Sequence, residues 1–310
     1  MKQVILAKPR GFCAGVERAI EIVERALKKY GAPIYVRHEI VHNRYVVEDL
    51  RQKGVVFVDE VSSVPPGSVV IFSAHGVAEQ VEKDAAGRNL QSIDATCPLV
   101  KKVHTEAQKR ESEGRQLILI GHQGHPEVEG TSGRVKQDVI LVQNIDDVRK
   151  IVVRDPSKLA YVTQTTLSVD DTKNIVQALK ERFPEVAGPE LKDICYATQN
   201  RQDAVKKLVE QIDLLLVIGS YSSSNSNRLK DLGIASGIPT FLVDNPDDLK
   251  VHMFMGIDRI GITAGASAPQ ALLDQMLDKL RELFDINVQE IEGIEEHVKF
   301  NLPMDLREVA

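Results

Sequence analysis

The feature of this 310-residue chain that most limits its fold is a regular alternation of short apolar runs with helix-like stretches. Polar residues seldom interrupt the runs, which is typical of parallel strands that are covered on both faces. This order of elements predicts an α/β protein with parallel sheets. The predicted strands are residues 3–8, 33–36, 68–74, 116–121, 159–164, 213–219, 240–243 and 259–264.

The composition, with 43% hydrophobic and 27% charged residues, is that of an ordinary globular protein. Its formal net charge of −6 argues against a nucleic-acid binder, which is usually basic. No apolar run approaches the roughly 20 residues that span a bilayer. The apolar run near the N-terminus is shorter than the ~7–15 residues of a secretory signal. We therefore expect a cytoplasmic protein that binds neither nucleic acid nor membrane.

The chain has only three cysteines, Cys13, Cys97 and Cys195, and each stands directly before a predicted helix. Pro98 suits the first position of the second helix, and Thr198 is a possible cap of the third. The cysteines are 84 and then 98 residues apart, about the size of a small α/β unit. This weak repeat predicts three related units, and three cysteines are too few for a disulfide framework.

The equivalent placement of the cysteines indicates that their thiols bind something. A helix N-terminus lowers the pKa of a thiol, because the backbone N–H groups and the helix dipole favour the anion. A structural zinc site normally has four ligands in close pairs such as C-x₂-C, and no such pair exists here. Three thiolates on a 4Fe–4S cluster would leave one iron open for a substrate oxygen. The pattern favours a catalytic cluster, although a single buried cysteine is more often a packing residue.

Five predicted strands run into loops rich in small polar residues, whose N–H groups and hydroxyls suit phosphate oxygens. Any one of these loops alone could simply turn the chain. None matches a P-loop or a well-placed GxGxxG, so no nucleotide is predicted. Glu127 lies two residues beyond His125, close enough for one proton-handling site. The loops are residues 73–78, 121–130, 163–171, 219–229 and 263–269, and the histidines in or beside them are His42, His75, His122 and His125.

Taken together, these segments resemble the 4-hydroxy-3-methylbut-2-enyl diphosphate reductase (IspH/LytB) family. The resemblance covers the chain from near residue 1 to about residue 270, in the order of the family. The stretches that carry it are GFCAGVERAI, VHNRYVV, FSAHGV, DATCPLVKKVH, IGHQGHPEVEGT, VTQTTLSVDDT, DICYATQNRQ, SSSNSNRL and GITAGASAP.

The resemblance implies three α/β units in a pseudo-threefold trefoil around a central 4Fe–4S cluster, one per chain. The units would be residues 14–96, residues 97–193, and residues 1–13 together with 194–283, followed by a C-terminal tail at 284–310. Cys13, Cys97 and Cys195 would each bind one iron.

The family reaction is the last step of the non-mevalonate isoprenoid pathway. Two electrons and two protons remove the allylic hydroxyl of 4-hydroxy-3-methylbut-2-enyl diphosphate, which gives isopentenyl diphosphate and dimethylallyl diphosphate. The resemblance also implies a one-electron donor such as ferredoxin or flavodoxin.

Carried over by position, the resemblance implies two sets of site residues. The first would hold the diphosphate: His42, His75, Ser223, Asn225 and Ser267, with Ser224 in the same loop. The second would bind near the departing hydroxyl and act in catalysis: Thr165 and Glu127, with His125 assisting. Glu127 would deliver the proton, directly or through the diphosphate.

Two other classes of function stay open from the residues. The first is a cluster-binding sensor or scaffold without turnover, which has no need of five phosphate-type loops and a glutamate beside a histidine. The second is a hydrolase or transferase that binds zinc through cysteine and histidine. Metal and acid-labile sulfide analysis separates this class from the others.

Overall fold

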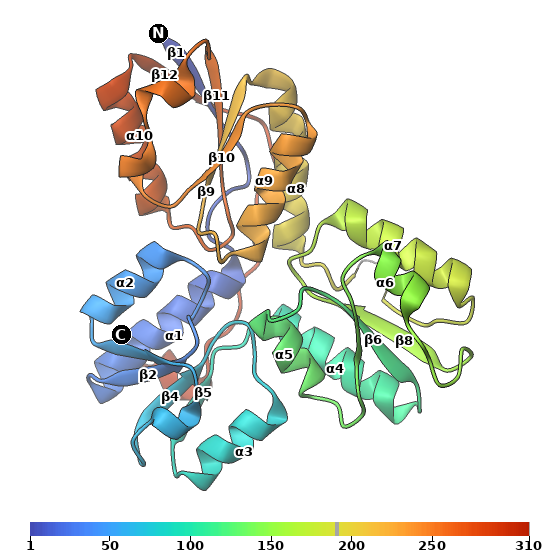
Figure 1. Cartoon of the computed structure of the whole chain (residues 1–310). Helices are drawn as coiled ribbons and strands as arrows, with labels where there is room; N and C mark the ends of the chain where they lie inside the picture. The colour runs from blue at the N-terminus through green and yellow to red at the C-terminus, as the bar shows by residue number, and fades with distance from the viewer. Residues whose placement is uncertain (190–191, 310) are drawn as a thin grey trace. The chain divides into compact units, whose positions relative to one another are not determined.

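The computed structural model describes residues 1–189 and 192–309. Its strands form three sheets of five, four and three strands, and every pairing between strands is parallel. The predicted α/β class is therefore confirmed (Figure 1). The chain folds into two compact units. Unit 1 contains Met1–Glu17, Val41–Leu50 and Tyr196–Lys299, and unit 2 contains Arg18–Ile40, Arg51–Cys195 and the residues from Phe300.

The five-stranded sheet of unit 1 has the order β10-β9-β11-β1-β12. One of its faces is covered by α10 (Gln270–Leu283) and the other by α8 (Tyr196–Leu208) and α9 (Ser224–Ala235), as Figure 1 shows. Both faces are apolar, which explains the unbroken apolar runs of the central strands. The strands are β1 (Lys2–Leu6), β9 (Leu214–Ile218), β10 (Thr240–Val243), β11 (Arg259–Ala264) and β12 (Ile286–Glu290).

The first and last segments of unit 1 meet in this sheet. β1 lies between β11 and β12, so the N-terminal residues join strands that come more than 200 residues later in the chain. The sequence predicts a tail from residue 284, whereas the structure forms an edge strand at β12. Ile286 and Val288 are half-buried and alternate with exposed Asn287 and Gln289, the pattern of a strand with one covered face.

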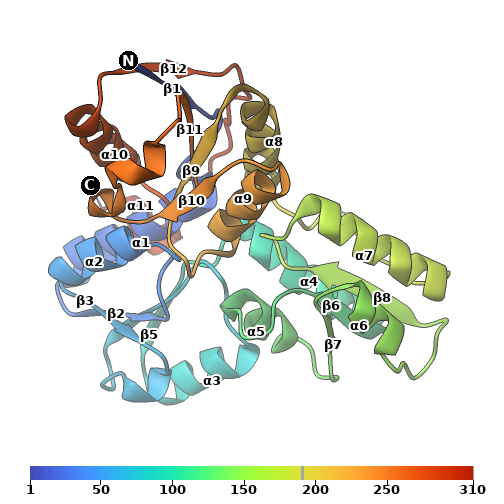
Figure 2. The same cartoon turned by 45° about the horizontal axis from the view of Figure 1, so that its top comes forward.

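Unit 2 contains the other two sheets. The four-stranded sheet has the order β3-β2-β4-β5, and α3 (Glu79–Gly87) packs against it. The three-stranded sheet has the order β7-β6-β8. Its faces are covered by α4 (Pro98–Ser112) with α5 (Pro126–Ser132) and by α6 (Ile145–Lys150) with α7 (Val169–Arg182) (Figure 2). The strands are β2 (Ile34–Arg37), β3 (Val55–Val58), β4 (Val69–Phe72), β5 (Gln91–Asp94), β6 (Gln116–Ile120), β7 (Ile140–Val142) and β8 (Leu159–Thr163).

The remaining helices are α1 (Ala14–Tyr30), α2 (Arg44–Gln52) and the short α11 (Met304–Arg307). Each cysteine directly precedes a helix, as predicted: α1, α4 and α8 begin one residue after it. Pro98 is the first residue of α4, as expected. The prediction that Thr198 caps the third helix is wrong, because α8 already begins at Tyr196 and Thr198 is buried inside it.

The division into three related units stays a prediction, since the contacts divide the chain into two compact units that hold three sheets. In the part of the chain that the structure describes, no helix has the length and apolar character needed to cross a membrane.

Candidate active site

The buried carboxyl group of Glu127 lies against Thr165 in unit 2. Glu127 is in the first turn of α5, and Thr165 follows the carboxyl end of β8. The backbone N–H of Thr165 donates to Glu127 Oε1 over 2.6 Å, and Thr165 Oγ1 donates to Oε2 over 3.1 Å. Glu127 is only 2% exposed. Both carboxyl oxygens are therefore fixed by the segment that follows β8.

Burial raises the pKa of Glu127 to about 7, and the two hydrogen bonds from Thr165 oppose this shift. The nearby carboxyl group of Asp193 adds to the increase. Burial also raises the pKa of Asp193 itself to about 6. At neutral pH the Glu127 carboxyl is therefore near the midpoint of its titration, so it can hold a proton and release it.

Two histidines lie at the N-terminus of α5, the helix that carries Glu127. His125 is the N-terminal cap of α5, and its Nδ1 accepts from the Glu127 backbone N–H over 3.1 Å. An Nδ1 that accepts leaves the proton of a neutral imidazole on Nε2. The ring of His75 stands perpendicular to that of His125, with their centroids 5.7 Å apart. Ser73 Oγ and His75 Nδ1 are 3.2 Å apart, within hydrogen-bonding distance.

Glycines allow the close approach of the His75 loop, residues 73–78, to α4 and α5. Gly76 has φ of +78°, and a Cβ there would lie 2.6 Å from Cε1 of buried His104. A Cβ on Gly130 would be 3.2 Å from the Gly76 carbonyl, and one on Gly133 would be 2.2 Å from the Ala78 Cβ. Larger side chains at these positions would push the loop away from α5.

The predicted polar residues of unit 1 gather at the N-terminus of α9. Ser223 caps the helix, and its Oγ accepts from the Ser226 backbone N–H over 3.2 Å. Asn225 is 4% exposed, yet neither its Oδ1 nor its Nδ2 has a hydrogen-bonding partner in the structure. A Cβ on Gly219 or Gly265 would lie 2.2 or 2.1 Å from Ser226 Oγ, so two loops close tightly on this helix end.

The segment that carries His42 is tied to the same loops. Ser267 Oγ donates to the His42 carbonyl over 2.9 Å, and the Arg44 backbone N–H donates to Ser220 Oγ over 2.9 Å. His42, Ser223, Asn225 and Ser267 therefore belong to one hydrogen-bonded group of loops, and Ser224 is the first residue of α9.

None of the three cysteines is in a disulfide, and their backbone N–H groups bond to the predicted loops. In unit 2, Cys97 N–H donates to the Ala74 carbonyl over 3.0 Å, and Cys195 N–H donates to the Thr165 carbonyl over 3.1 Å. In unit 1, Cys13 N–H donates to the Ala266 carbonyl over 3.2 Å. Among residues 1–189 and 192–309, no three His, Cys, Asp or Glu side chains are grouped as ligands of one metal ion.

Two contacts that support these loops are absent from the sequence-based site. Ser220 falls in the predicted polar loop at 219–229, so the loop indicates it even though the resemblance does not. Buried Asn43 caps α2 through a bond from the Val46 N–H to Oδ1 over 3.1 Å, while its Nδ2 has no partner in the structure. An asparagine three residues before the apolar pair Val46–Val47 is the available signal.

Comparison with known proteins identifies the family. A family model described as LytB protein matches residues 4–281. The chain belongs to the LytB family. This membership confirms the resemblance on which the site residues were chosen.

Members of the LytB family that resemble the chain match it over nearly their whole length. The 4-hydroxy-3-methylbut-2-enyl diphosphate reductase of Ralstonia nicotianae is 56% identical over 305 residues, which are 98% of this chain and 94% of the relative. The enzyme of the same name from Methylococcus capsulatus is 57% identical over 308 residues, 98% of each chain.

Solved structures extend the similarity to the LytB fold. The E-1-hydroxy-2-methyl-but-2-enyl-4-diphosphate reductase of Plasmodium falciparum has a TM-score of 0.93 and 39% identity, and the match covers 98% of this chain and 96% of that one. A second structure, described as the terminal enzyme of the non-mevalonate pathway, has a TM-score of 0.65 and 32% identity and covers 91% of this chain and 100% of that one.

Proposed function

We propose that this chain is a 4-hydroxy-3-methylbut-2-enyl diphosphate reductase. It removes the allylic hydroxyl of its substrate with two electrons and two protons and forms isopentenyl diphosphate and dimethylallyl diphosphate. The observation that carries this proposal is the buried Glu127–Thr165 pair, whose carboxyl group has a pKa of about 7. The proposal is also supported by relatives that bear this name, because more than half of the aligned residues are identical over nearly the whole length of each relative.

The donor set fits a 4Fe–4S cluster bound by Cys13, Cys97 and Cys195. None of the three thiols is in a disulfide, and each stands before a helix, where N–H groups favour the thiolate. When bound, the cluster supplies single electrons and a Lewis-acidic iron with no protein ligand.

Glu127 is the proton donor to the departing hydroxyl in this proposal. Hydroxide is a poor leaving group, so a carboxylic acid that protonates its oxygen lowers the barrier. The N–H and Oγ1 of Thr165 donate to the carboxylate that remains and stabilise it in a site that excludes water. His125 orients Glu127 by accepting its backbone N–H and carries its own proton on Nε2, which suits it to donate to substrate.

The diphosphate is held by neutral donors in the same proposal, namely His42, His75, Ser223, Ser224, Asn225 and Ser267. Asn225 supports this assignment, because a buried amide without partners is costly unless a ligand satisfies it. The N-terminus of the 12-residue helix α9 adds favourable N–H groups for an anion.

A one-electron donor such as ferredoxin or flavodoxin completes the cycle in this proposal, because the cluster accepts electrons singly. We place the enzyme in the cytoplasm, a reducing compartment that keeps the three thiols out of disulfides.

The decisive experiment is anaerobic turnover of 4-hydroxy-3-methylbut-2-enyl diphosphate by purified protein with a chemical reductant. We expect both isoprenoid diphosphates as products, with iron and acid-labile sulfide in the protein. Replacement of any one cysteine by serine should lower the iron content. A protein that holds a cluster without turnover would be a sensor or scaffold. A colourless zinc protein without sulfide would contradict the proposal.

A further inference from the structure

Arg201 is a fully buried arginine that forms hydrogen bonds with the main chain directly before Cys13. Its side chain is 0% exposed. Nε and Nη2 donate to the Gly11 carbonyl over 3.0 and 2.7 Å, and Nη2 also donates to the Phe12 carbonyl over 3.1 Å. Nη1 forms an ion pair with Glu296 over 3.1 Å. The two carbonyls that precede the cysteine are therefore fixed by one charged group.

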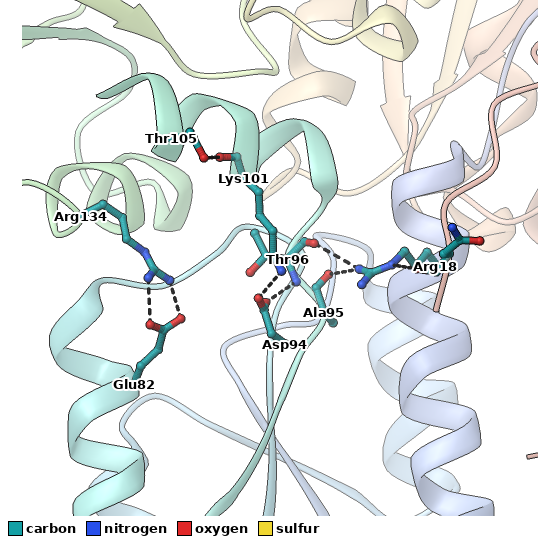
Figure 3. A network of polar contacts seen from close by, with 9 residues as sticks. Arg18, Glu82, Asp94, Ala95, Thr96, Lys101, Thr105 and Arg134 are labelled. Atoms are coloured by element: carbon teal, nitrogen blue, oxygen red, sulfur yellow. Dashed lines mark hydrogen bonds and ion pairs between the residues drawn. The ribbon is translucent and has the colours of Figure 1, made fainter. Parts of the chain in front are cut away.

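Arg18 makes the equivalent contacts before Cys97. Its Nη1 donates to the Ala95 carbonyl over 3.3 Å and to the Thr96 carbonyl over 3.2 Å, and its side chain reaches these atoms from α1 in Figure 3. Its Nε donates to the Asn301 carbonyl over 2.8 Å. Arg18 is buried like Arg201. Again an arginine holds the two carbonyls before a cysteine, and again the C-terminal segment holds the arginine.

These two contacts belong to a regular pattern along the chain. The helix after each cysteine carries a cation five or six residues on: Arg18, Lys102 and Arg201. Each cation donates to the segment before another cysteine, and Lys102 Nζ donates to the Lys192 carbonyl over 3.1 Å, three residues before Cys195. The contact of Lys102 is expected to be the weakest of the three, because Lys102 is exposed to solvent whereas both arginines are buried.

The buried arginines also act on the thiols through their charge. Burial raises the pKa of Cys13, and the Arg201 guanidinium opposes this increase. Burial lowers the pKa of Arg18, and the charges of Asp94 and Cys97 oppose that decrease. Each guanidinium is hydrogen-bonded to the carbonyl of the residue directly before its cysteine, which brings a positive charge close to that thiol.

We infer that Arg18 and Arg201 are positioning residues of the iron–sulfur site. Each fixes the main chain before one cysteine ligand and places a positive charge beside that thiolate. This inference rests on the proposed function, since it assigns the two arginines a role toward the cluster. It also makes a statement about the protein without its cluster, namely that the two cysteine loops are rigid because the arginines hold them.

The first test compares cluster release from Arg18→Met, Arg201→Met and the matched control Lys102→Met. Each protein is reconstituted anaerobically with iron and sulfide, and the transfer of iron to a chelator is followed. Hydrogen bonds from a charged donor contribute about 1.5–3 kcal/mol each, so both arginine variants should release iron at least about ten-fold faster. Lys102→Met should stay within about two-fold of the wild-type rate, because an exposed contact contributes little.

The second test is amide hydrogen exchange of the cluster-free proteins over residues 11–14 and 95–98. Arg201→Met should speed exchange in the first segment only, and Arg18→Met in the second only. A defect confined to one loop is not expected from general destabilisation.

The third test separates charge from packing and also covers a methionine variant that does not fold. Arg18→Lys and Arg201→Lys keep the charge and lose the forked donor, so they should keep the midpoint potential near the wild-type value while releasing iron faster. In the methionine variants, loss of a positive charge should make the midpoint potential more negative.

Release rates, exchange and potential all equal to wild type in the arginine variants would overturn the inference and leave the proposed function intact. A wild-type protein that takes up no cluster would contradict the proposed function instead, and the exchange data would still decide whether the arginines hold the loops.

Discussion

Glu127 combines near-complete burial with two hydrogen bonds to its carboxyl oxygens, and this combination makes its side chain the sharpest test of the chemistry. Glu127→Gln keeps the shape and removes the transferable proton. We expect kcat to fall by about 10²–10⁴-fold, with cluster content and KM close to wild type. Anaerobic steady-state kinetics measure this change. Glu129→Gln, on an exposed residue of the same helix, is the control and should leave kcat unaltered. Similar rates for both variants would remove Glu127 from the mechanism.

The raised pKa of Glu127 also predicts how stability depends on pH. In the unfolded chain its pKa is near the ordinary 4.5, whereas burial raises it to about 7 in the folded protein. Between these values the folded state binds more protons, so the wild type loses stability as pH rises from about 4.5 to about 7. Glu127→Gln lacks this loss, so its stability relative to wild type should rise over that range by about 3 kcal/mol.

Urea unfolding of the cluster-free proteins between about pH 4.5 and pH 8 measures this difference. The raised pKa of Asp193 acts in the same direction, and the part that comes from its own burial is present in both proteins and cancels in the comparison. A difference that does not vary with pH would mean that Glu127 ionises normally in the folded protein.

Single residues show what a sequence can and cannot reveal about this site. Glu127 and Thr165 were predicted from the resemblance, and the structure joins them by two hydrogen bonds. Arg18 and Arg201 were not predicted, because arginine on a charged helix ordinarily faces solvent. Their burial depends on carbonyls and C-terminal residues that lie far away in sequence, and helical periodicity carries no information about such partners.

At the scale of elements, all eight predicted strands form, and the four strands that were not predicted are sheet edges. These are β3, β5, β7 and β12. β5 and β12 mix polar with apolar residues and lack a continuous apolar run, whereas β3 and β7 are apolar but only four and three residues long. In β5, only Ile93 of the four residues is buried. The strands that were predicted are buried at half or more of their positions, and these include β8 and β10 at the edges of their sheets.

The contact between the 73–78 loop and His104 of α4 predicts a sensitive glycine. Gly76→Ala would place a methyl group in the left-handed region and against the His104 ring. We expect the free energy of unfolding to fall by about 1–3 kcal/mol and KM for the substrate to rise, because the neighbouring His75 would shift away from His125. Chemical unfolding and steady-state kinetics test the two parts.

The control for this prediction is Gly87→Ala at the end of α3. This glycine has an ordinary φ, and a Cβ there would meet nothing within 4 Å. The substitution should leave KM unchanged and should not lower the free energy of unfolding, since alanine favours helix over glycine. If Gly76→Ala behaved in the same way, the close packing of the 73–78 loop would contribute neither to stability nor to substrate binding.

At the scale of the whole chain, the C-terminal segment is a structural part of both units. Within unit 1, Glu295 pairs with Lys8 over 3.1 Å, and Glu296 pairs with Arg201 over 3.1 Å. Within unit 2, Arg18 donates to the Asn301 carbonyl over 2.8 Å. The residues after β12 have little regular structure, yet they hold side chains that come from the first and middle parts of the chain. Their role could not be predicted from composition, because an acidic stretch without periodicity usually indicates a solvated tail.

Two adjacent glutamates allow this role to be measured. Glu296 is paired with a guanidinium that is 0% exposed, so Glu296→Ala would leave a buried charge without its partner and should lower the free energy of unfolding by about 3–5 kcal/mol. Glu295→Ala removes an exposed ion pair that solvent screens, and it should not change stability measurably. Urea unfolding of the cluster-free variants compares them directly. The two substitutions remove the same number of atoms and the same charge from neighbouring positions. A large difference between them would come from the contacts of Glu296 with buried Arg201 and with Asn200, whereas equal effects would show that the segment only lies on the surface.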